Sequence, residues 1–182
     1  NILLIGGAMA FTFLKAMGYE IGKSLVEEKC LSIAIDVLAK AKEKGVTILL
    51  PSDIVCAKDI EKPETIDVKS ITSLESDDIG LDIGPETCIN FDMFIKSSKM
   101  IMWNGPMGLF EKSYFSTGTQ TIASSIEECD KDVTTIIGGG ETVTAIHNFN
   151  SEMEFTHIST GGGSSLEMLS GKTLPALKSL GV

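Results

Sequence analysis

Four glycine-rich loops are the part of this sequence best suited to chemistry. They comprise residues 6–8, 104–108, 138–140 and 161–163, and each leads into a helix-like stretch. At the start of a helix the backbone N–H groups are unpaired, and the helix dipole adds about half a positive charge, so anions bind there. A single loop of this kind also occurs in an ordinary tight turn. Four loops at one edge predict a ligand that carries phosphate groups.

Two acidic residues, Glu111 and Glu141, lie within or next to these loops. Each has two interpretations. A carboxylate in the first turn of a helix stabilises that helix by about 0.3–1 kcal/mol without any ligand. A carboxylate beside bound phosphates can also hold Mg²⁺, which takes one or two acidic ligands together with water and phosphate oxygens. Glu111 suits a ribose instead, because its oxygens accept hydrogen bonds from sugar hydroxyl groups.

Each loop follows a short apolar run, at positions 2–5, 100–103, 135–137 and 157–160, and a fifth run covers 46–50. Runs of this length, bounded by turn-forming residues, predict strands that are buried on both faces of a parallel sheet. Helices are expected between them, over 24–44, 85–98, 114–128, 141–149 and 164–170. The polar segment 57–78 predicts a small hairpin or excursion at the sheet edge.

This alternation of strand, loop and helix predicts an α/β fold. We expect a doubly wound, Rossmann-like, mainly parallel sheet with helices on both faces, in three αβα layers. Right-handed crossovers then place every strand-to-helix loop at the same edge of the sheet. The 182 residues, 43% of them apolar, are enough for one buried core, so residues 1–182 are expected to form a single domain.

The composition excludes several classes of partner. The chain carries 15 Lys+Arg against 25 Asp+Glu, a net charge of −10, whereas nucleic acid or an anionic membrane requires a basic face. No apolar run approaches the roughly 20 residues of a membrane span. The four cysteines match no metal-ligand spacing, which favours free thiols in a reducing cytoplasm. Because Asn1 opens directly into an apolar run, without an initiator Met, the chain is interpreted as a fragment.

Two standard phosphate-binding fingerprints do not match. A Walker A loop has four residues between its glycines, but Gly18 and Gly22, which precede Lys23, are separated by three. The dinucleotide pattern Gly-x-Gly-x-x-Gly lacks its last glycine in both triple-glycine loops. A Rossmann-type domain that binds a dinucleotide or S-adenosylmethionine is therefore the disfavoured alternative.

Five segments together resemble a known family. They are residues 6–15, 80–86, 103–111, 136–140 and 157–163, and they span nearly the whole chain in order. These segments are similar to the C-terminal, nucleotide-binding lobe of phosphoglycerate kinase. The resemblance implies a kinase that interconverts 1,3-bisphosphoglycerate plus ADP with 3-phosphoglycerate plus ATP in glycolysis, with Mg²⁺ as cofactor.

The resemblance also implies roles for individual residues. The adenine is expected to lie against Gly6, Gly7 and Gly84, and the ribose against Glu111. Groups at the nucleotide phosphates are expected to come from two loops, through Asn104, Gly139, Gly140, Glu141 and Thr142. Glu141 is the expected Mg²⁺ ligand, at a position where the family typically has aspartate. The transferring phosphoryl group is expected to face Thr160, Gly161, Gly162 and Gly163.

Two parts of the family pattern are not in these residues. One is the N-terminal lobe, which in the family binds phosphoglycerate and supplies a catalytic arginine. The other is the first strand and loop of the nucleotide lobe, which carries lysines that reach the phosphates. Near the glycine loops only Lys112 offers a positive charge. The chain alone is therefore expected to be catalytically silent, a nucleotide-binding module without chemistry, and monomeric as the family usually is.

Overall fold

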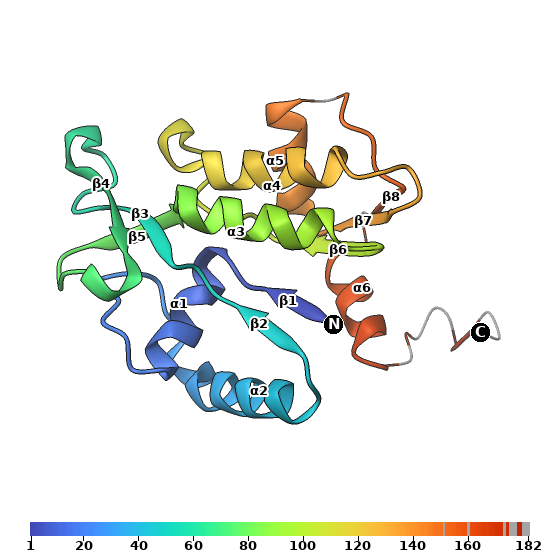
Figure 1. Ribbon diagram of the computed structural model, residues 1–182, viewed down its shortest axis with the longest axis horizontal. Helices are drawn as coiled ribbons and strands as arrows, with labels where there is room; N and C mark the ends of the chain where they lie inside the picture. The colour runs from blue at the N-terminus through green and yellow to red at the C-terminus, as the bar shows by residue number, and fades with distance from the viewer. Residues whose placement is uncertain (151, 160, 173, 175–177, 180–182) are drawn as a thin grey trace.

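The computed structural model describes residues 1–150, 152–159, 161–172, 174 and 178–179, and Figure 1 shows how their elements are arranged. It confirms the expected α/β class, with mainly parallel strands and helices packed in layers. In chain order the strands and α-helices are β1 (Ile2–Leu4), α1 (Gly7–Ala16), α2 (Leu31–Glu43), β2 (Thr47–Leu49), β3 (Asp53–Ala57), β4 (Ile66–Ser70), β5 (Ile79–Ile83), α3 (Pro85–Lys96), β6 (Met100–Asn104), α4 (Thr117–Glu127), β7 (Thr134–Gly138), α5 (Gly140–Phe149), β8 (His157–Ser159) and α6 (Gly162–Leu169).

The strands form three separate ladders. β1 pairs with β2, and β6, β7 and β8 pair in that order, all in parallel. The third ladder is antiparallel, with the order β4-β3-β5. Among the described strands, the parallel ones therefore form two ladders rather than one continuous sheet, because β1 and β6 do not pair with each other.

Two predicted elements have different bounds in the structure. The helix expected from position 24 begins at Leu31, after a 3₁₀ turn at Glu28–Cys30. Ser24 lies outside the helix, and its hydroxyl accepts a hydrogen bond from the backbone N–H of Gly80, at 2.9 Å. The excursion expected at 57–78 is larger than a hairpin. β3 precedes β4 in sequence and β5 follows it, and β3 pairs with both β4 and β5.

The expectation that the parallel strands are buried on both faces is wrong for β1 and β6, and also for β2 and β8, which each have exposed residues. Ile2 and Leu3 of β1 are each 44% exposed, and Met100 of β6 is 67% exposed. The main core instead lies between β6, β7, α3 and α4, where the largest buried side chains are Phe91, Trp103, Ile122, Ile126 and Ile137.

A buried aspartate fixes the start of α3. The Asp53 carboxylate, 6% exposed, accepts hydrogen bonds from the backbone N–H groups of Glu86 at 3.0 Å and Thr87 at 2.7 Å. It also accepts from the Thr87 hydroxyl at 2.6 Å. The carboxylate therefore caps the first turn of α3 from a neighbouring strand, where the unpaired N–H groups of a helix need acceptors.

Asp53→Ala is expected to lower the free energy of unfolding by about 2–4 kcal/mol, because the variant loses the cap and leaves buried donors unpaired. Urea denaturation followed by circular dichroism measures the change. Asp53→Asn is the matched control and is expected to lose less, since its amide oxygen still accepts one of these bonds. Equal stability of Asp53→Ala and the original chain would contradict the capping role.

Candidate functional site

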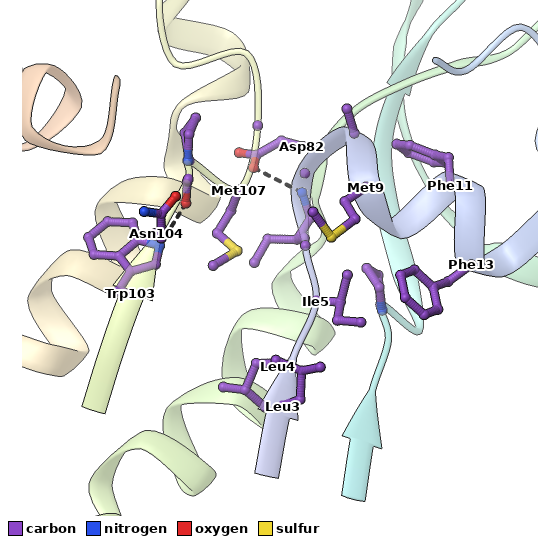
Figure 2. Close-up of a pocket in the computed structure, with 18 of the residues that line it drawn as sticks. Leu3, Leu4, Ile5, Met9, Phe11, Phe13, Asp82, Trp103, Asn104 and Met107 are labelled. Atoms are coloured by element: carbon purple, nitrogen blue, oxygen red, sulfur yellow. Dashed lines mark hydrogen bonds between the residues drawn. The ribbon is translucent and has the colours of Figure 1, made fainter. Parts of the chain in front are cut away.

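One large cavity lies between the two parallel ladders, with β1 and β6 on its two sides. It has a volume of about 1380 Å³ and is lined by β1, by the start of α1, by β5, by β6 with the loop that follows it, and by Glu141 of α5. Figure 2 shows β1 with Leu3 and Leu4 on one side of this cavity, and the end of β6 with Trp103 and Asn104 on the other. β1 and β6 run in the same direction, so their carboxyl ends lie at the same edge (Figure 2).

The first glycine loop forms the turn from β1 into α1, and both of its glycines line the cavity. Gly7 has a backbone φ of +60°, a conformation that residues with a Cβ rarely adopt. Its N–H donates to the carbonyl oxygen of Met107 at 3.1 Å, and a Cβ added to Gly7 would lie 2.7 Å from the carbonyl oxygen of Pro106. Only glycine lets the start of α1 approach the loop after β6 this closely.

The second loop, residues 104–111, is fixed from three directions. The Met107 N–H donates to the Thr119 hydroxyl at 3.0 Å, and the Leu109 N–H donates to the Leu81 carbonyl at 2.8 Å. At the start of the loop, the Trp103 indole N–H donates to the Gly105 carbonyl at 2.8 Å (Figure 2). These bonds hold the loop in one conformation, and it leads to Glu111, which is exposed and lines the cavity.

Asp82 is a buried acid beneath this loop that sequence reasoning missed. The residue is only 3% exposed and lines the cavity. Its carboxylate accepts hydrogen bonds from the N–H groups of Gly118 at 2.7 Å and Ile83 at 2.9 Å. A Cβ on Gly108 or Gly118 would collide with this carboxylate. Burial raises the pKa of Asp82 to about 7, although the two backbone bonds oppose the rise. An acidic residue inside the apolar run of β5 was the signal that could have identified it.

The third loop brings Asn104 next to the start of α5. Gly139, with φ +90°, caps this helix, and a Cβ there would lie 3.2 Å from the Asn104 side-chain oxygen. The buried Thr142 hydroxyl accepts the Gly105 N–H at 2.7 Å, which ties α5 to the loop after β6. Gly140 and Glu141 form the first turn of α5, and Glu141 is exposed at the cavity edge.

The oxygen donors at this edge suit Mg²⁺. The Glu141 carboxylate and the Asn104 side-chain amide both line the cavity, and carboxylate and amide oxygens are hard ligands of the kind that Mg²⁺ accepts. A single carboxylate leaves room for the water and phosphate oxygens that complete the shell of this ion.

The remaining predicted residues are divided between the cavity and other places. Gly84 does not line the cavity; it caps α3 and lies against Asp53, while Gly80 and Leu81 do line it. Gly161 caps α6, and Gly162 and Gly163 form its first turn, on the helix whose Leu166 lines the cavity. Thr160 lies outside the described residues.

Positive charge is scarce around the cavity. Lys112 pairs with Glu61 at 2.7 Å, outside the cavity lining. Among the described residues that line the cavity, the only lysine is Lys99, which precedes β6 and so lies at the far end of that strand from Asn104. The sequence contains no arginine. Backbone N–H groups and helix starts are therefore the main groups here that can attract an anion.

The fold and the cavity define a doubly wound α/β domain with its candidate ligand site at the carboxyl ends of the parallel strands. More particularly, the chain belongs to the phosphoglycerate kinase family, because the sequence model of that family matches residues 1–172.

Individual relatives agree with this assignment. The chain is 51% identical over 174 residues to a phosphoglycerate kinase of Dictyoglomus turgidum, covering 96% of the chain and 44% of the relative. It is 46% identical to the chloroplastic phosphoglycerate kinase 1 of Arabidopsis thaliana, covering 99% of the chain and 38% of the relative. The solved structure of phosphoglycerate kinase from Coxiella burnetii matches with a TM-score of 0.91 at 40% identity, covering 97% of the chain and 45% of that structure. The chain thus spans less than half the length of these relatives.

None of the described helices is both long enough and apolar enough to cross a membrane.

Proposed function

We propose that this chain is the C-terminal, nucleotide-binding lobe of a phosphoglycerate kinase. In the complete enzyme it would hold ADP or ATP while a phosphoryl group passes between 1,3-bisphosphoglycerate and ADP, giving 3-phosphoglycerate and ATP. Phosphoglycerate would bind to the other lobe. We further propose a cytoplasmic, monomeric protein with no nucleic acid or membrane partner, which agrees with its net charge of −10.

The observation that carries this proposal is the convergence of two glycine loops and Glu141, in the first turn of α5, on one cavity; Gly139, Gly140 and Thr142 lie next to this lining and not in it. Gly6 and Gly7 line it from α1, the loop 104–111 lines it from β6, and Glu141 lines it from the start of α5. A nucleotide needs an apolar surface for its base, acceptors for its ribose and N–H donors for its phosphates. Ile83 and Met107, together with Gly6 and Gly7, offer the first, Glu111 offers the second, and the helix start after β7 offers the third.

Glu141 would hold Mg²⁺ in the proposed site. The ion, when bound, neutralises charge on the phosphate oxygens during transfer. The chain's own contribution is geometric. Gly139 and Gly140 present the first N–H groups of α5, and the bond from Gly105 to Thr142 keeps that helix in register with Asn104. Phosphoryl transfer depends mainly on such positioning and on charge stabilisation.

Glu141→Gln is expected to weaken binding of MgADP several-fold, because the neutral amide is a poorer Mg²⁺ ligand, and to leave binding of metal-free ADP unchanged. Isothermal titration calorimetry of the chain with ADP, in Mg²⁺ and in EDTA, measures both. We expect a dissociation constant of about 1 µM to 1 mM for MgADP with the original chain.

Glu86→Gln is the matched control, since Glu86 is also an exposed acid in the first turn of a helix but does not line the cavity. It is expected to bind MgADP as the original chain does. Equal weakening of both variants, or weakening of Glu141→Gln that persists in EDTA, would contradict the metal role. No binding of ADP by the folded chain would contradict a nucleotide site formed by these residues alone.

The 182 residues alone are expected to show no kinase activity. Transfer needs cationic side chains near the moving charge, and the cavity has only Lys99 among its described lining residues, in a chain without arginine. A coupled assay with 3-phosphoglycerate, ATP and Mg²⁺ tests this expectation at high protein concentration. Turnover faster than in buffer alone, in an activity that co-purifies with the chain, would overturn this expectation.

A further inference from the structure

The buried Asp82 carboxylate connects β5, α4 and the loop after β6. It accepts a hydrogen bond at 2.7 Å from the N–H of Gly118, in the first turn of α4, so it caps this helix from a neighbouring strand. In the loop it lies against Gly108, where an added Cβ would collide with the carboxylate. The position of α4 relative to the loop therefore depends on this one side chain.

The start of α4 in turn positions the surface proposed for the nucleotide base. Thr119 directly follows Gly118, and its buried hydroxyl accepts from the Met107 N–H at 3.0 Å. Met107 packs against the first glycine loop, since a Cβ added to Gly6 would collide with the Met107 Sδ atom. Asp82 and Met107 are thus held by consecutive residues of one helical turn, and both line the cavity (Figure 2).

A charge on Asp82 has no positive partner. Among the described residues it forms no ion pair, and its hydrogen bonds come from the backbone N–H groups of Gly118 and Ile83. Burial raises the pKa of this carboxyl to about 7, although these two bonds oppose the rise. The group therefore changes its charge near neutral pH, at a position that lines the cavity.

The titratable groups on the elements around Asp82 supply no compensating positive charge. Burial raises the pKa of the thiols of Cys88 on α3 and Cys56 on β3 to about 11, and the charge of Asp82 adds to the rise at Cys88. Asp53 on β3 caps α3, and Glu111 lines the same cavity as a further acid. Charged groups on the other sides of these elements are paired or exposed: Lys15 of α1 pairs with Glu28, Lys96 with Asp92 within α3, Lys112 of the loop with Glu61, and Glu127 is exposed in the last turn of α4.

A bound nucleotide would favour the neutral form of this carboxyl for two reasons. It would displace water from the cavity beside Asp82, and it would bring its own negative charge into the same space. Both effects oppose ionisation. Because linkage is reciprocal, a ligand that favours the protonated carboxyl must itself bind more tightly at a pH where the carboxyl is protonated.

We propose that Asp82 is a positioning residue of the nucleotide site, and that MgADP binds preferentially to the chain whose Asp82 carboxyl is protonated. This inference rests on the proposed function. The protonated carboxyl still has an oxygen that accepts from Gly118, so it holds α4 and the loop in place without adding a negative charge beside the nucleotide. Affinity for MgADP is highest below pH 7 and falls as the pH rises through the range in which Asp82 ionises in the free chain.

Calorimetric titrations with MgADP at pH 6 and pH 8.5 measure this dependence. The ratio of the two dissociation constants is expected to be about fivefold larger, or more, for the original chain than for Asp82→Asn. The variant reports the titration of the nucleotide itself and of every other group. At pH 7.5, titrations in HEPES and in Tris, which differ in their enthalpy of ionisation, are expected to show uptake of about half a proton more by the original chain than by the variant.

Two further variants separate proton linkage from structural support. Asp53→Asn also changes a buried aspartate that caps a helix, but Asp53 does not line the cavity. This variant is expected to keep the pH dependence of the original chain. Thr119→Val removes the acceptor of the Met107 N–H without removing a titrating group, and it is expected to weaken MgADP binding by a similar factor at both pH values.

A measurement on the original chain needs no variant that folds well. With ¹³C-labelled aspartate carboxyl groups, NMR follows the ionisation of Asp82 directly, and saturating MgADP is expected to raise the midpoint by about one pH unit. An unchanged midpoint, an equal pH dependence of binding in the original chain and Asp82→Asn, or its loss in Asp53→Asn would each overturn the inference while leaving the proposed function intact. Absence of MgADP binding at both pH values would instead overturn the proposed function and this inference together.

Discussion

In the original chain, Asp82 is expected to make the free energy of unfolding fall by about 4 kcal/mol as the pH rises through the range in which this carboxyl ionises, and Asp82→Asn is expected to abolish this fall. Burial raises the pKa of Asp82 to about 7 in the folded chain, whereas an unfolded chain releases this proton near pH 4. Each unit of difference corresponds to about 1.4 kcal/mol. The stabilising contribution is therefore complete below about pH 4, declines as the pH rises toward 7, and is lost above 7, where the buried carboxyl must ionise.

Urea unfolding of both proteins between pH 4 and pH 8 measures the effect. The advantage of the original chain over Asp82→Asn is expected to fall by about 4 kcal/mol across this range. Thr119→Val is the control, because it removes the acceptor of the Met107 N–H in the same loop without changing a titrating group. It is expected to cost similar stability at every pH. A difference between Asp82→Asn and the original chain that does not vary with pH would contradict burial as the cause of the raised pKa.

Gly7→Val is expected to cost at least about 3 kcal/mol of unfolding free energy. Two effects add. A β-branched residue at φ +60° is strained by about 1–3 kcal/mol, and the new Cβ would lie 2.7 Å from the Pro106 carbonyl oxygen, which forces the loop after β6 to move. Because this loop and Gly7 both line the cavity, MgADP binding is expected to be lost as well.

Gly18→Val separates the two effects. Gly18 also has a positive φ, +90°, but a Cβ there would meet nothing within 4 Å. It is expected to cost only the backbone strain, about 1–3 kcal/mol, and to bind MgADP as before. Chemical denaturation and calorimetry measure both variants. Equal effects of the two substitutions on stability and on MgADP binding would contradict a role for the close approach of α1 to the loop after β6.

The existence of most elements could be predicted from local patterns. The glycine loops, the apolar runs before them and the helices α3, α4, α5 and α6 lie within a few residues of their expected positions, because each is specified by nearby residues. β3 and β5 were not expected as strands. Their pairing joins residues that are distant in sequence, such as Ile54 and Ile83, and the local hydrophobic pattern does not predict such a pairing.

The candidate site was predicted less completely than the fold. Gly6, Gly7, Asn104, Glu111 and Glu141 do line one cavity, as expected for loops at one edge of a parallel sheet. Gly84 does not line the cavity, because it lies against Asp53 at the start of α3. This contact could not be predicted, since Asp53 belongs to β3, a strand that the sequence patterns did not indicate. Asp82 escaped notice for a similar reason. Its importance arises from Gly108 and Gly118, which come close to it only after folding.

The cavity between the two parallel ladders is the proposed nucleotide site. The most direct test is to map MgADP on the ¹⁵N-labelled chain by NMR, following backbone amides during a titration. We expect the largest shift changes at Gly6, Gly7, residues 104–111 and residues 139–142, which line the cavity or lie directly beside Glu141 in its lining. No changes are expected at Gly18, Gly22 or Gly45, which lie outside the cavity lining and are distant in sequence from these loops. Saturable shift changes confined to other surfaces, with these loops unaffected, would contradict the proposed site.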